Sequence, residues 1–131
     1  MSIQAIHSIL SGHAGYTTVS SGGVFSYMAK EGISKPYTII FTDQGSEPIK
    51  SQGNAATKEW KDIIVACFAI TTADAKNLAN TARAVLDEYT GTVEGIKVEY
   101  CKYDGTDEED YDRQLKKASI ELRFRVCYTL S

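Results

Sequence analysis

The densest group of side chains that could do chemistry is an acidic run at residues 104–112, with the sequence DGTDEEDYD. Calcium prefers oxygen ligands, so carboxylates in this number could bind it. The spacing does not fit a calcium-binding loop, because no glycine stands at its sixth position and no glutamate at its twelfth. We therefore predict a solvated acidic loop over 104–112, with a calcium site or an interaction loop as the alternatives.

The two histidines and the one glycine-rich turn offer little to a catalytic site. His7 and His13 both lie near the N-terminus, and their spacing matches no metal-binding motif. A serine or cysteine nucleophile needs a base held beside it, and these two residues provide little choice of one. Residues 20–23 (SSGG) lack the lysine of a phosphate-binding loop and open no convincing helix. We therefore expect no enzyme, no catalytic or metal-binding residue and no cofactor.

The cysteines and the overall charge exclude further classes. Cys67, Cys101 and Cys127 are odd in number and lack CxxC spacing, which argues against a disulfide framework or a zinc site and favours buried, reduced thiols. A net charge of -3 with scattered lysines and arginines argues against a nucleic-acid binder. No apolar run reaches about 18 residues, so no membrane span is expected. The N-terminus lacks the basic region of a signal peptide, so we expect synthesis in the cytoplasm.

The last segment, residues 118–130, alternates between apolar and polar side chains. This pattern is typical of a strand with one packed face and one exposed face. The predicted packed face carries Ala118, Ile120, Leu122, Phe124, Val126, Tyr128 and Leu130, and the other face carries Ser119, Glu121, Arg123, Arg125, Cys127 and Thr129. Arg123 and Arg125 therefore belong to a mixed-charge face, which is solvated surface, a subunit interface or the wall of a channel.

Three longer stretches indicate the elements that position these groups. Apolar residues recur at helical spacing from Ala75 to Tyr89, with Thr72 as a fitting N-cap and Gly91 after the end. Residues 60–70 (WKDIIVACFAI) form an apolar run typical of a central strand covered on both faces. The polar stretch 43–58 is too long for a tight hairpin turn, so we predict a long loop there.

Shorter patterns complete the expected fold. They predict a helix over 2–11, a loop over 12–23, and strands over 24–29, 37–42 and 95–103. The order is α-β-β-β-α-β-β. We expect a single α+β domain over residues 1–131, with an antiparallel or mixed β-sheet of about four to five strands packed on one face by two helices. The passage from strand 60–70 through the helix to strand 95–103 could be a crossover or an antiparallel return.

The ordered set of these segments resembles a known family, the tail-completion proteins of long-tailed phages, whose members act as tail terminators or head–tail joining proteins. The likeness covers nearly the whole chain. It is carried by the helix SIQAIHSIL with the glycine-rich loop and the Gly23-Val24-Phe25 segment, by PYTIIF at 36–41, by the strand 60–70 running into the helix 74–87, and by the final segments 95–100, Tyr111-Asp112 and 119–128.

This resemblance implies a structural virion protein at the end of the tail tube, in the neck of the particle. Relatives form hexameric rings that stop tube growth and join the tail to the head connector. The implied partners are further copies of the chain, the tail tube protein and a head–tail connector or stopper protein, with genomic DNA passing through the lumen unbound. A domain of this length has a radius of gyration of about 14 Å, so a ring of such subunits could admit duplex DNA.

Within this expectation, two segments become candidate interaction regions. The loop 43–58 could reach a neighbouring subunit or the tube, and its candidate contact residues are Glu47, Lys50, Gln52, Asn54 and Lys58. The acidic run could line the lumen through Asp107, Glu108, Glu109 and Asp110, where negative charge would keep DNA from adhering. The alternatives to a terminator are a neighbouring neck subunit, such as a head-completion or stopper protein, and a soluble small binding module.

Overall fold

The computed structural model describes residues 2–28, 33, 35–42, 47–49, 58–93, 95–112 and 117–130. In chain order the elements are α1 (Ser2–Ser11), α2 (Ala14–Val19), β1 (Gly23–Ser26), β2 (Tyr37–Thr42), β3 (Glu47–Ile49), β4 (Lys58–Ala69), α3 (Thr72–Leu86), β5 (Gly91–Val93), β6 (Ile96–Asp112) and β7 (Lys117–Leu130).

All the described strands belong to one mixed sheet. Its order is β1-β2-β4-β7-β6-β5, and β3 pairs with the first residues of β4. The β1–β2 pair is parallel, and every other pair is antiparallel. Strands β4 and β6 both run antiparallel to β7, so they point the same way with β7 between them. The passage from β4 through α3 to β6 is therefore a crossover, which settles a choice that the sequence leaves open.

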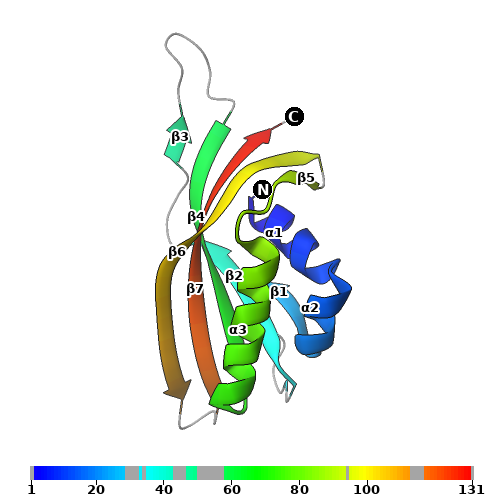
Figure 1. Cartoon of the computed structure of the whole chain (residues 1–131), viewed down its shortest axis with the longest axis vertical. Helices are drawn as coiled ribbons and strands as arrows, with labels where there is room; N and C mark the ends of the chain where they lie inside the picture. The colour runs from blue at the N-terminus through cyan, green and yellow to red at the C-terminus, as the bar shows by residue number, and fades with distance from the viewer. Residues whose placement is uncertain are drawn as a thin grey trace.

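The three helices lie together on one face of the sheet (Figure 1). The side chains between the two layers form the main core, in which Leu10, Tyr16, Leu78 and Phe124 are essentially inaccessible to water. Full burial of a side chain of this size is worth about 1.5–3 kcal/mol. We call the opposite face of the sheet, which carries no helix in the described part of the chain, the outer face.

Helix α3 forms where the apolar periodicity predicts it. Its residues Ala75, Leu78, Ala79, Ala82 and Leu86 are buried against the sheet. The N-cap is Thr71, one residue before the predicted Thr72, and its hydroxyl accepts a hydrogen bond from the Asp74 N–H at 3.1 Å. Asp74 places a negative charge near the positive end of the helix dipole.

Helix α2 lies inside the stretch predicted as a loop, residues 12–23. Its sequence AGYTTV is a poor helix former, so local propensity gives little sign of it. Burial of Tyr16 and a cap at His13 stabilise it instead. The following turn brings Gly22 close to β2, where its N–H donates to the Pro36 carbonyl at 2.7 Å; a Cβ on Gly22 would lie only 2.8 Å from that oxygen. Glycine is thus needed at position 22 because the turn packs closely against the backbone that leads into β2.

The predicted fold class is confirmed in its broad form, because the chain folds as α+β with a mixed sheet and helices on one face. The number of elements was underestimated: α2, β3 and β5 were not predicted. The acidic loop over 104–112 is a wrong prediction, because these residues form the second half of the long strand β6. Their composition opposes strand formation, and the backbone of β7 overrides it by pairing with them from Asp107 to Asp112.

Within the described residues, every helix is too short or too polar to cross a membrane.

Candidate interaction surfaces

The loop predicted over 43–58 falls largely outside the described residues, including Lys50, Gln52 and Asn54. Residues 47–49 and Lys58 are described at the level of the backbone. Glu47 begins β3, opposite Trp60, and Lys58 begins β4, opposite Thr129 of β7. The sequence did not indicate β3, which extends the sheet beside the start of β4.

The acidic candidates lie far from that end of the sheet. Asp107 stands opposite Leu122 of β7, whereas Lys58 stands opposite Thr129, seven residues further along the same strand. At roughly 3.3 Å per residue, this separates the two groups by roughly 23 Å. Figure 1 shows the same arrangement, with β3 at one end of the molecule and the end of β6 at the other. The described parts of the two predicted interaction regions therefore lie at opposite ends of the sheet.

Arg123 and Arg125 lie on β7 in the middle of the sheet, between β4 and β6. The predicted alternation is correct from Ala118 to Val126, because residues 118, 120, 122, 124 and 126 are buried while the arginines are half-buried or exposed. In register, Arg123 stands opposite Ile64, and Arg125 stands opposite Asp62 and Lys102. The arginines thus belong to the outer face, which carries a mixed charge. Cys127 departs from the pattern and is buried, since β4 and β6 flank it on both sides.

The outer face also carries an apolar surface that the sequence only partly indicates. Tyr37 stacks on Phe68 with ring centroids 4.9 Å apart, and Phe25 meets Tyr37 edge-on at 6.4 Å. We call these three residues the aromatic row. It crosses β1, β2 and β4, and the Lys117 ammonium lies 4.8 Å from the Tyr37 ring centre and donates a hydrogen bond to its hydroxyl at 3.3 Å.

Beside the aromatic row, the outer face remains apolar along β4. Ile64 and Ala66 are 5% and 2% exposed, although they point away from the helices. The prediction of a central strand covered on both faces is therefore correct for residues 63–67 of β4, whereas Asp62 and Ile70 are exposed. The apolar run predicts this burial, but only the register shows that Ile39 and Phe41 of β2 stand directly opposite Ala66 and Ile64.

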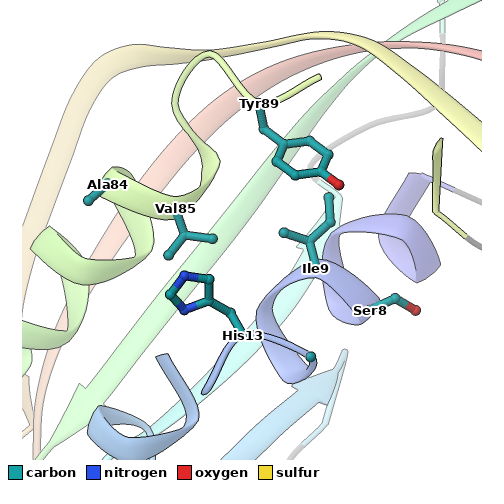
Figure 2. Close-up of a pocket in the computed structure, with 7 residues that line it drawn as sticks. Ser8, Ile9, His13, Ala84, Val85 and Tyr89 are labelled. Carbon is teal, nitrogen blue, oxygen red and sulfur yellow. The ribbon is translucent and has the colours of Figure 1, made fainter. Parts of the chain in front are cut away.

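An open hollow of about 390 Å³ lies on the helical side of the molecule. Ser8 and Ile9 of α1 line one wall, Val85 and Tyr89 line the other, and His13 lies between them (Figure 2). The His13 Nδ1 accepts a hydrogen bond from the Tyr16 N–H at 3.1 Å, so this nitrogen is already used as the cap of α2. The hollow therefore has a mixed polar and apolar lining, and its histidine has a structural role as the cap of α2.

Buried hydroxyl groups link α2 to the sheet beneath it. The Tyr16 hydroxyl is hydrogen-bonded to the Thr38 hydroxyl, which also meets the Ser20 hydroxyl at 3.1 Å. Ser20 donates in turn to the Gly23 carbonyl at 2.9 Å. Burial raises the pKa of Tyr16 far above its ordinary value, so this phenol stays protonated and acts as a structural hydrogen-bonding group.

The three cysteines are buried and free of disulfides, as the sequence predicts. Burial raises the pKa of both Cys67 and Cys101 to about 12. At neutral pH these thiols are protonated, and the thiol form is a weak nucleophile. Among the described residues, no group of three or more His, Cys, Asp or Glu side chains is arranged to hold a metal ion.

The geometry thus describes a small α+β domain whose outer face carries an aromatic row and a mixed-charge region around Arg123 and Arg125. A search against models of known protein families finds no match, and neither does a search of curated proteins. A comparison with solved structures finds a similar chain in the virion of a native gene transfer agent particle, with a TM-score of 0.75 and 13% sequence identity. The match covers 96% of this chain and 92% of that chain, so the two share a fold over nearly their whole length.

Proposed function

We propose that this chain is a structural virion protein that forms a ring at the end of a phage-type tail tube, stops tube polymerisation and joins the tail to the head connector. The observation that carries the proposal is the shared fold with a chain of a gene transfer agent virion over 96% of this sequence. The sequence resemblance to tail-completion proteins supports the same role from the order of its segments.

The surfaces fit a protein that works by assembly. A ring requires head-to-tail contacts between two different patches of one subunit. The two ends of the sheet carry different chemistry: β3 and Lys58 lie at one end, and the acidic half of β6 lies at the other. We infer a homo-hexamer that contacts the tail tube protein on one side and a connector or stopper protein on the other. The protein is then a component of the neck and has no enzymatic activity.

We propose that the acidic residues of β6 line the lumen of this ring. They do so as part of a strand, and not as the loop that the sequence predicts. DNA is repelled by fixed negative charge, so an acidic wall lets the genome pass without adhering. Replacing Asp107, Glu108, Glu109 and Asp110 together by their amides should slow DNA ejection. Unchanged ejection and infectivity would remove the lumen assignment while leaving the structural role intact.

The decisive experiment is a nonsense mutation in this gene in the phage or prophage that carries it, followed by electron microscopy of the lysate. DNA-filled heads beside separate tails of uncontrolled length are the result expected of a terminator. Tails of normal length beside heads that have lost DNA would favour the neighbouring neck role of a head-completion or stopper subunit. Intact infectious particles would contradict any structural role in the neck.

A small binding module is the second candidate, and the hollow between α1 and α3 is the observation that favours it. Such a module should be complete as a monomer, and shortening the segment 43–58 should leave its function intact. A terminator that uses this segment to reach the tube should lose function instead.

A further inference from the structure

One edge of β6 pairs with β7, and we call the opposite edge the outer edge of β6. The partners of this outer edge change along the strand. At its start, Ile96, Lys97 and Val98 pair with β5. Just beyond, the turn that ends α3 closes the edge: the Glu88 N–H donates to the Cys101 carbonyl at 2.7 Å, and the Tyr103 N–H donates to the Asp87 carboxylate at 3.0 Å. These contacts satisfy backbone groups that would otherwise offer a template for another strand.

This protection ends at a break in the register. Tyr103 stands opposite Phe124, but the next pair is Asp107 with Leu122, so three residues of β6 bulge against one residue of β7. Bulges of this kind bend a strand and redirect its edge. From Asp107 to Asp110 the inner edge of β6 pairs with β7, and no described strand lies on the outer side. Figure 1 shows this half of β6 at the border of the sheet, beyond the helices.

The composition of this half of β6 selects the kind of strand that could pair with it. Residues 107–110 are four consecutive acidic residues, and no lysine or arginine lies between Asp104 and Asp112. Like charges on directly opposite positions of neighbouring strands are destabilising, and opposite charges are stabilising. Repulsion therefore disfavours a second copy of the same edge, whereas a strand with lysines or arginines is favoured.

We propose that the outer edge of β6 from Asp107 to Asp110 is a docking site for an extended, lysine- or arginine-bearing segment of another protein, which adds to the sheet as a further strand. Backbone hydrogen bonds supply the general affinity of such an addition, and the charges select the partner. The site is compatible with an acidic lumen wall, because side chains project from the faces of a strand while its hydrogen-bonding groups point along the sheet. The inference rests on the strand edge and does not depend on the proposed tail role.

The test uses the purified full chain and a synthetic peptide, KVKTKVKT, whose lysines alternate with strand-forming residues. Amide hydrogen exchange is followed by mass spectrometry with and without the peptide. We expect exchange in the segment 107–111 to slow by about tenfold, since added backbone hydrogen bonds protect amides. A peptide with glutamates for the lysines tests the charge, and one with prolines at alternate positions tests the backbone bonding, because proline donates no hydrogen bond.

Two charge-matched variants complete the design. Glu108→Gln/Glu109→Gln should weaken peptide binding several-fold, whereas Asp62→Asn/Glu88→Gln, which neutralises two exposed residues elsewhere, should leave it unchanged. Far-UV circular dichroism checks that both variants keep the fold. Equal protection by the lysine and glutamate peptides, protection by the proline peptide, or no protection by any of them would overturn the proposal. Protection of the same amides by raised protein concentration alone would assign the edge to a second copy and would also overturn it.

Discussion

The Asp87 carboxylate accepts a hydrogen bond from the backbone N–H of Tyr103 at 3.0 Å, joining the residue that ends α3 to the edge of β6. The bond is partly buried, and it fixes the strand at the last position before the register shift. Asp87 thus ends the helix through its backbone N–H, which donates to the Arg83 carbonyl at 2.9 Å, and protects a strand edge through its side chain.

We expect Asp87→Ala to lower the free energy of unfolding by about 1–3 kcal/mol, because a partly buried N–H loses a charged acceptor. Urea denaturation at pH 7 measures the loss. Asp87→Asn is the matched control, since its amide oxygen can still accept the bond, and it should retain most of the stability. A loss as large in Asp87→Asn as in Asp87→Ala would show that the hydrogen bond is not the cause.

Substitution of the next residue, Glu88, by glycine should raise the free energy of unfolding. Its φ of 64° places it in the left-handed region just past the helix end, where glycine is preferred. Glu88→Gly removes a long exposed ion pair with Lys102, 3.9 Å between charged atoms, and relieves the backbone strain. We expect a gain of about 0.5–1 kcal/mol in the free energy of unfolding. Glu88→Ala is the control and should give no such gain, and a loss of stability in Glu88→Gly would contradict the argument.

Tyr16→Phe tests the buried hydroxyl groups beneath α2. The substitution keeps the ring in the core and removes one partner of the Thr38 hydroxyl, so we expect a loss of about 1–2 kcal/mol. Tyr27 is a suitable comparison because it is 60% exposed, and Tyr27→Phe should change the free energy of unfolding by less than about 0.5 kcal/mol. Thermal denaturation followed by circular dichroism measures both variants. Equal effects would mean that the Tyr16 hydroxyl contributes nothing beyond the ring.

Stability should fall as the pH rises above about 9, through the buried thiols. Burial raises the folded-state pKa of Cys67 and Cys101 to about 12, so the folded protein holds these protons after the unfolded chain has released them. Their contribution is fully present below the unfolded-state pKa near 9 and is lost as the pH rises toward the folded-state value. Denaturation midpoints at pH 7.5, 9 and 10 measure the slope.

The Cys67→Ala variant identifies the source of that pH dependence. It should begin less stable at pH 7.5, because a fully buried side chain is shortened, but its stability should fall less steeply with pH. Every other titratable side chain is the same in both proteins, so the difference between the two slopes reports the thiol. Parallel slopes would remove Cys67 as a contributor.

Much of the architecture follows from the sequence itself. The helical spacing of apolar residues from Ala75 to Leu86 determines α3, because only a helix brings these positions to one face. The alternation along β7 determines which face meets the helices, since a strand turns successive side chains to opposite sides. The apolar run at residues 63–69 of β4 requires cover on both faces, and the structure provides it for residues 63–67.

Long-range contacts determine the elements whose local propensity opposes their conformation. Helix α2 depends on the burial of Tyr16 and the cap at His13, and neither is visible before the chain folds. The acidic half of β6 is a strand because β7 pairs with it, although its own residues favour a loop. The register likewise places Lys117 over Tyr37 across 80 positions of sequence and separates the acidic edge from β3. Long-range packing and backbone pairing outweigh local preference at these places, because they act on every residue of the element at once.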